Sequence, residues 1–272
     1  MKKIRIGIVG CGAIGKSLAK FIDRELNSKA EISAICDLDL SKTVSFKKIL
    51  KKSKPVVTNL DKLIKNSDLI IESSSAKVSY EVAKKSVSNG KSILIMSIGG
   101  IILKAEELFA LARKNRSFIY LPSGAICGID GMKALSLAGI EKVTLTTRKP
   151  PKALSGVAYL MQKGIDVNKI KKETVIFEGT ALSAIKYFPQ NINVAALLSI
   201  SGIGAKKTKV KIITSPEYKY NYHEIEIVSK AGVLKTISQN VAFKENPKTS
   251  YLAALSAMAV LKGIFDSAKI GN

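Results

Sequence analysis

Three glycines near the N-terminus, Gly10, Gly12 and Gly15, follow a short apolar run and precede a helix-like segment. At this spacing the first glycine permits a tight turn, the second lets the backbone approach a ligand, and the third lets helix and strand pack closely. The start of the helix presents free N–H groups and a positive dipole end to an anion. We therefore predict a site for the pyrophosphate of a dinucleotide, to which Ala13 and Ile14 of the same turn also contribute.

A carboxylate follows at the place where such a site needs one. The second apolar run, residues 30–36, ends at Asp37. An acid there can accept hydrogen bonds from an adenosine ribose and repels a 2′-phosphate. Strand, glycine turn, helix, strand and acid occur in the required order, so a glycine turn that binds nothing is the weaker interpretation. The pattern predicts NAD or NADP as cofactor, with NAD favoured by Asp37.

Small polar residues follow two more β-like runs, residues 68–72 and 92–96. In doubly wound sheets, ligands bind outside the carboxyl ends of the strands. We therefore expect Ser74, Ser97 and Gly99 to line the cofactor site. The alternative is that these turns are generic connections between a strand and a helix.

His223 is the sole histidine of the chain and lies in an alternating segment, where it shares a strand face with Ile225 and Ile227. It is either a neutral histidine of the core or a general acid and base, because an unperturbed histidine titrates near neutral pH. Arg148, at the end of a strand expected over residues 142–148, is either a clamp for a carboxylate or a surface ion pair. The residue pattern leaves both pairs of hypotheses open.

The elements that must position these residues alternate between strand and helix through residue 121, which predicts a parallel, doubly wound sheet of the α/β class. Residues 122–131 are small and mostly uncharged, as in a hinge or a loop that approaches a flat ring. The following segment reads as a smaller α+β domain with a mixed or antiparallel sheet.

Residues 246–250 are expected to open a final apolar helix over 251–268 that returns to the first domain. The predicted dinucleotide-binding domain thus comprises residues 1–122 and 246–272. Residues 123–245 form the predicted domain for substrate, catalysis and dimerisation.

The chain carries 44 lysines and arginines against 21 acidic residues, a net charge of +23. The basic residues are spread along the chain and few are arginines, so we expect no specific nucleic-acid partner and a surface that attracts small anions. No apolar run is long enough for a membrane span, and the first strand starts almost at the N-terminus, so neither membrane association nor a signal peptide is expected. The cysteines, Cys11, Cys36 and Cys127, lack paired spacing, which predicts no metal site and a reducing, cytoplasmic location.

Six segments together resemble the L-aspartate dehydrogenase family. They are GIVGCGAIG at 7–15, SIGG at 97–100, SGAICGID at 123–130, FPQNINVAA at 188–196, HEI at 223–225 and NPKTSYLAALS at 246–256. The resemblance implies a Rossmann domain, a smaller catalytic domain and commonly a homodimer. It also implies reversible, NAD(P)-dependent deamination of L-aspartate to oxaloacetate and ammonia through iminoaspartate, in several members linked to NAD biosynthesis.

Carried over by position, the resemblance implies that His223 is the catalytic histidine. Ala125, Cys127 and Asn193 would contact the cofactor near its nicotinamide. We expect Asn193 to contact substrate as well, and Lys248 and Thr249 to bind it as groups suited to a carboxylate. The chain departs from the family at 214–216, where it reads Thr-Ser-Pro and members often have Ala-Asp-Pro.

Two alternative functions stay open. One is another two-domain oxidoreductase on aspartate-derived substrates, of the homoserine dehydrogenase or dihydrodipicolinate reductase type; the lack of a histidine-rich loop disfavours the reductase. The other is a non-enzymatic protein that senses NAD or binds nucleic acid, which the basic charge favours and the lack of a recognisable DNA-binding module opposes.

Overall fold

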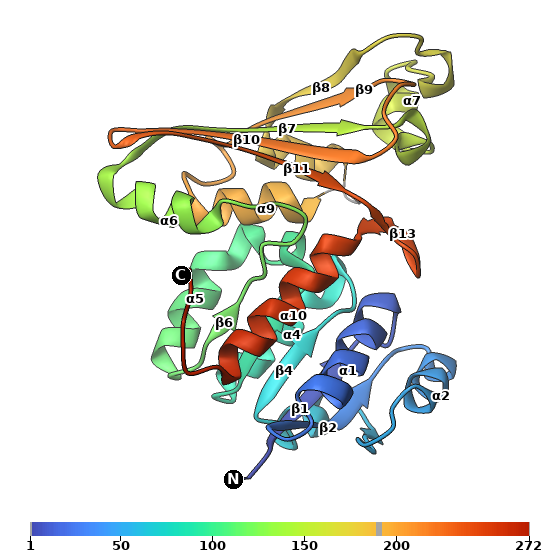
Figure 1. The fold of residues 1–272 in the computed structure, drawn as a ribbon, viewed down its shortest axis with the longest axis vertical. Helices are drawn as coiled ribbons and strands as arrows, with labels where there is room; N and C mark the ends of the chain where they lie inside the picture. Colours follow the sequence, from blue (N-terminus) through green and yellow to red (C-terminus); the bar gives the residue numbers. More distant parts are fainter. Residues whose placement is uncertain (1, 189–191, 272) are drawn as a thin grey trace. The chain divides into compact units, whose positions relative to one another are not determined.

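The computed structural model describes residues 2–188 and 192–271. It divides into two compact units, Met1–Pro122 with Ala254–Ile270, and Ser123–Ala253 (Figure 1). The chain leaves the second unit a few residues later than the expected boundary at 246, because residues 246–250 pair as a strand within that unit.

The first unit is built on a parallel sheet with the strand order β3-β2-β1-β4-β5-β6. Its strands are β1 (Ile4–Val9), β2 (Ala30–Cys36), β3 (Val56–Val57), β4 (Leu69–Glu72), β5 (Ser92–Ile95) and β6 (Ile119–Tyr120). The order reverses between β1 and β4, which creates the crevice where ligands bind in such sheets. The predicted doubly wound α/β fold is confirmed.

Helices connect these strands and bury their apolar faces against them. They are α1 (Ala13–Glu25), α2 (Leu40–Lys48), α3 (Leu60–Lys65), α4 (Ala76–Ser88) and α5 (Ala105–Lys114), with 3₁₀ turns at Ile98–Gly100 and Ile102–Lys104. Leu18 and Ile22 of α1 pack in one cluster with Ile8 of β1. The last helix, α10 (Tyr251–Phe265), adds Ala257 and Leu261 to this cluster, which confirms the expected return of the C-terminal helix.

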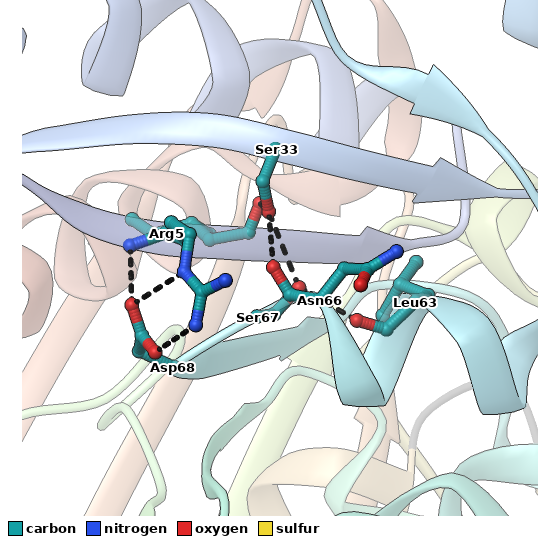
Figure 2. Close-up of polar contacts among 7 residues, drawn as sticks. Arg5, Ser33, Leu63, Asn66, Ser67 and Asp68 are labelled. Carbon is teal, nitrogen blue, oxygen red and sulfur yellow. Dashed lines mark hydrogen bonds and ion pairs between the residues drawn. The ribbon is translucent and has the colours of Figure 1, made fainter.

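Polar contacts join the start of the sheet to the segment before β4, as Figure 2 shows. The backbone N–H of Arg5 donates to the carboxylate of Asp68, and its guanidinium donates to the same group at 2.8 Å. The hydroxyl of Ser33 on β2 donates to the carbonyl of Asn66 and lies 3.3 Å from the hydroxyl of Ser67. These contacts tie β1 and β2 to the segment that leads into β4.

The second unit is built on a mixed sheet with the order β11-β10-β7-β9-β8. Its strands are β7 (Ile140–Lys149), β8 (Thr174–Thr180), β9 (Lys209–Thr214), β10 (Asn221–Ser229) and β11 (Gly232–Asn240). Strands β7 and β9 are parallel and the other pairs are antiparallel, as expected. A short pair, β12 (Ala242–Phe243) with β13 (Asn246–Ser250), follows the sheet.

The helices of this unit are α6 (Ile129–Ala138), α7 (Ala158–Gln162), α8 (Ala181–Tyr187) and α9 (Ile192–Ser201), with 3₁₀ turns at Pro151–Leu154 and Val167–Lys169. Helices α6 and α9 lie on the same face of the sheet (Figure 1). Val143, Leu145, Thr147 and Lys149 of β7 are buried, whereas the residues between them are half-buried on the other side.

Four local features differ from the expectations. Residues 129–131 were expected to belong to a flexible loop, but they open α6, and α7 was also not predicted. Residues 246–250 form β13 instead of a helix start, since a proline without an N–H is tolerated in a short edge strand as well as in a first helical turn. Helix α10 ends at Phe265, before the expected 268. No helix in the described part of the chain is long and apolar enough to cross a membrane.

Candidate active site

The three glycines of the first turn have different surroundings. Gly10 has a φ of +98°, and a Cβ there would lie 2.5 Å from the carbonyl oxygen of Ser73. A Cβ on Gly15 would collide with the carbonyl of Gly10. A Cβ on Gly12, in contrast, would meet no atom within 4 Å. The first and third glycines are therefore needed by the fold, whereas Gly12 leaves space at the start of α1.

That space suits a phosphate group. Gly12 is the N-cap residue directly before α1, and within the described structure no side chain caps the helix. The first N–H groups of a helix have no partner within it and attract anions. A small residue, open space and free donors coincide at Gly12, so the turn fits the pyrophosphate of a nicotinamide dinucleotide.

Asp37 lies against this turn. One oxygen of its carboxylate accepts a hydrogen bond from the backbone N–H of Cys11 at 2.7 Å, and the other accepts from the N–H of Asp39 at 2.9 Å. The two contacts fix the carboxylate beside the glycine turn, at the ends of β1 and β2. This is the position from which an acid can accept hydrogen bonds from a ribose.

Ser74 and Ser97 are brought together by Glu72, the last residue of β4, which is fully buried. The Glu72 carboxylate accepts from the N–H and hydroxyl of Ser74 at 2.8 and 2.7 Å, and from the N–H and hydroxyl of Ser97, both at 3.0 Å. Ser79 of α4 donates a further hydrogen bond at 3.1 Å. One carboxylate thus holds two turns at the carboxyl edge of the sheet. Gly99 lies in the second of these turns.

His223 is on β10 and is 7% exposed, on the same face as Ile225 and Ile227, as expected. Its Nδ1 lies 3.0 Å from the hydroxyl oxygen of Thr147 on the neighbouring strand β7. Burial, together with the positive charge of Lys149, lowers the pKa of His223 to about 3. The imidazole is therefore neutral at neutral pH, which is the form that a general base needs.

A pocket lies on this face of the sheet. Thr147 and Lys149 of β7 are its polar lining residues among those described, and the remainder of the lining is apolar: Leu145, Val210 and Ile212 from the sheet, with Ala184, Phe188 and Ala195. Burial lowers the pKa of Lys149 to about 8. Thr147 lines the pocket and also contacts His223, so the histidine is adjacent to the pocket, although it is not among the described lining residues.

The loop before α6 packs beside the histidine strand. The carbonyl of Ala125 accepts hydrogen bonds from the Ser238 hydroxyl at 2.8 Å and from the Asn240 amide at 2.9 Å. Ser238 on β11 is the register partner of His223 on β10. Ala125 is buried, whereas Cys127 is exposed. Within the second unit, the structure therefore brings Ala125 close to the strand that carries His223.

Family models divide the chain at nearly the same place as the structure. Residues 130–264, which include His223, match the model for the C-terminal part of aspartate dehydrogenase. Residues 10–122 match the model for the NAD-binding domain of homoserine dehydrogenase. An L-aspartate dehydrogenase of Methanosarcina mazei is 43% identical over 99% of this chain and 100% of its own length. This chain belongs to the L-aspartate dehydrogenase family.

Other members of the family match over similar lengths. The L-aspartate dehydrogenase of Methanocella arvoryzae is 44% identical over 98% of this chain and 99% of its own. The crystal structure of aspartate dehydrogenase from Thermotoga maritima aligns with a TM-score of 0.76 and 25% identity, over 99% of this chain and 100% of that one. A homoserine dehydrogenase from Thiobacillus denitrificans, at 14% identity and a TM-score of 0.63, covers 97% of this chain and 73% of its own, and it shares the fold. The chain is thus an oxidoreductase with a dinucleotide-binding domain.

Arg148 does not face the pocket that Thr147 and Lys149 line. The strand pleat places its side chain opposite to those of Thr147 and Lys149, and its guanidinium pairs with Glu224 at 2.6 Å. Of the two hypotheses for Arg148, the structure shows the ion pair.

The remaining predicted substrate contacts lie in two different elements, α9 and β13. Asn193 lies in the first turn of α9 and is exposed, two residues before Ala195 of the pocket. Thr249 lies in β13, where its hydroxyl accepts a hydrogen bond from the Asn246 amide at 3.0 Å. The side chain of Lys248 lies outside the described part of the structure.

Sequence reasoning missed two buried charged residues beside the predicted site residues, Glu72 and Lys149. For Lys149 the signal was present, because the alternation expected over 142–148 continues for one more residue and places it on the face of Thr147. For Glu72 the signal was an acid at the end of an otherwise apolar strand.

Proposed function

We propose that this chain catalyses the reversible, NAD(P)-dependent oxidative deamination of L-aspartate to oxaloacetate and ammonia. The observation that carries the proposal is that the aspartate dehydrogenase model matches the half of the chain that holds His223, Thr147 and the pocket. The NAD-binding half alone is matched by a model named for homoserine dehydrogenase, so it does not distinguish the two activities.

The residues of the first unit fit a nicotinamide dinucleotide. We assign the pyrophosphate to the turn of Gly10, Gly12, Ala13, Ile14 and Gly15, and the adenosine ribose to Asp37. Ser74, Ser97 and Gly99 at the edge of the sheet, with Ala125, Cys127 and Asn193 of the second unit, are the other proposed contacts. When bound, the cofactor exchanges a hydride with C2 of the substrate. Because Asp37 carries a negative charge, NAD is the proposed preference over NADP.

His223 is the proposed general base and acid. In the direction of deamination, its neutral imidazole accepts a proton from the substrate ammonium, which leaves the amine lone pair free to form the C=N bond as C2 loses its hydride. Water then adds to iminoaspartate and releases oxaloacetate and ammonia. In the reverse direction, the proton that the substrate nitrogen takes up passes through His223. The hydrogen bond with Thr147 orients the ring for both steps.

We further propose that the protein is a homodimer in the cytoplasm and that its iminoaspartate feeds NAD biosynthesis. The three cysteines are free, which suits a reducing compartment. Light scattering of the purified protein tests the dimer.

A spectrophotometric assay tests the activity. Purified protein is mixed with oxaloacetate, ammonium and NADH or NADPH, and loss of the reduced cofactor is followed. The proposal expects oxidation that requires both oxaloacetate and ammonium. Oxidation with aspartate semialdehyde in place of oxaloacetate, and without ammonium, would instead support a homoserine dehydrogenase. Cofactor binding without turnover of either substrate would support the sensor hypothesis.

A further inference from the structure

The position of Lys149 is unusual for a lysine. It is the last residue of β7 and is only 7% exposed, whereas most lysines keep their ammonium group in water. Its strand is held on both sides, by β10 and by β9, and its own carbonyl accepts a hydrogen bond from the Thr214 hydroxyl at 2.8 Å. The backbone therefore fixes the direction in which this side chain leaves the sheet.

That direction leads into the pocket. Lys149 lines it together with Thr147, and in the described part of the chain the other lining residues are apolar. A charge in such surroundings loses hydration, which lowers the pKa of Lys149 to about 8 and still leaves the amine mostly protonated at neutral pH. The free space has room for about one water molecule, so an anion would meet this charge at the mouth of the pocket, where apolar walls screen it poorly.

The positive charge of Lys149 also acts on the pKa of His223, the proposed catalytic base. Lys149 and His223 are on one face of the sheet. Lys149 follows Thr147 by two residues on β7, and His223 is the register partner of Thr147 on β10. The ammonium group of Lys149 contributes to keeping His223 neutral. An anion bound beside Lys149 would therefore also lie next to the group that moves the proton.

We propose that Lys149 binds a carboxylate of the substrate in the pocket beside Thr147 and His223. The proposal rests on the proposed function, since L-aspartate and oxaloacetate each carry two carboxylates and a charge-assisted hydrogen bond from an ammonium group suits either. It assigns to Lys149 the role that the sequence had offered to Arg148, which the pleat turns to the other face.

The test compares Lys149→Met with Lys152→Met. Both changes remove one lysine charge, but Lys152 is exposed in the turn after β7. Replacing a buried charge by an apolar side chain of similar length is often neutral or stabilising, so Lys149→Met is expected to fold. Lys149→Gln serves as a second variant if it does not.

Two readouts separate this inference from the proposed function. In the enzymatic assay, kcat/KM for oxaloacetate is expected to fall about 100-fold in Lys149→Met, with the affinity for NADH, measured by fluorescence titration, unchanged. In a thermal melt without cofactor, succinate is expected to stabilise the wild type and Lys152→Met but not Lys149→Met.

The outcomes are distinguishable. Wild-type protein that is stabilised by succinate through Lys149 but does not turn over oxaloacetate would contradict the proposed function and support the carboxylate site. An active wild type whose Lys149→Met and Lys149→Gln variants keep its kcat/KM would overturn the inference. The same conclusion follows if succinate stabilises neither the wild type nor the control, or stabilises all variants equally.

Discussion

The Nδ1 atom of His223 lies 3.0 Å from the hydroxyl oxygen of Thr147. A hydroxyl can donate to this nitrogen or accept from it, so the contact is kept in either tautomer of the ring. Since Nδ1 is engaged by Thr147, we expect the proposed proton exchange with the substrate to use Nε2. A carboxylate in place of the threonine would hold a proton on Nδ1 and raise the pKa of the ring, whereas Thr147 orients the ring without charging it.

Thr147→Val tests this orienting role. Valine has nearly the same shape, so the fold is expected to be retained while kcat falls about tenfold and the affinity for NADH stays unchanged. Thr146→Val is the matched control, because Thr146 is the neighbouring residue on the opposite face of β7. Equal kcat values in the two variants would show that the hydroxyl of Thr147 does not position the ring.

The ionisation of His223 can be followed directly, because it is the sole histidine of the chain. Its pKa is lowered to about 3 by burial and by the charge of Lys149. NMR of the ring between pH 5 and 8 is therefore expected to show a neutral imidazole throughout in the free protein. In Lys149→Met the pKa should rise, because a like charge is removed. A titration near the ordinary value of 6.5 in the wild type would contradict the described burial.

The glycine turn predicts a contrast between Gly12→Ala and Gly10→Ala. A Cβ at Gly12 meets nothing, so Gly12→Ala is expected to melt near the wild-type temperature but to bind NADH at least about tenfold more weakly, since the methyl group occupies the phosphate space. Gly10→Ala is expected to lower the melting temperature, because it adds a collision with Ser73 at a φ of +98°. Unchanged NADH affinity in Gly12→Ala would remove the pyrophosphate assignment.

Asp37→Asn tests the cofactor preference. The amide oxygen of asparagine can still accept the hydrogen bond from Cys11, so this contact with the glycine turn is expected to remain, whereas the bond from the N–H of Asp39 and the negative charge are lost. The ratio of kcat/KM for NADPH to that for NADH should rise about tenfold, because a charge that repels the 2′-phosphate is gone. A ratio equal to that of the wild type would show that Asp37 does not set the preference.

Local patterns were sufficient to predict the first unit. The turn of Gly10, Gly12 and Gly15 lies within a few residues of its strand and helix, and the sheet edge follows from alternating elements. The network of Glu72 with Ser74 and Ser97 could not be predicted in the same way, because it joins two turns through a carboxylate buried only in the folded sheet.

The second unit was harder to predict because its site depends on partners distant in sequence. His223 meets Thr147 across a strand pair of distant segments, and periodicity shows which face each occupies but not that they are neighbours. The role of Arg148 was open until register and pleat separated it from Lys149. Helix α6 was missed because Gly128 and Gly131 make its start resemble a loop.

The most direct test of the account is the turnover of His223→Asn in the assay with oxaloacetate, ammonium and NADH. Asparagine keeps a polar group at the site but cannot exchange a proton as imidazole does, so kcat is expected to fall at least about 100-fold while NADH binds with the affinity of the wild type. A variant that retains the wild-type kcat would contradict the assignment of His223 as the acid and base of the reaction.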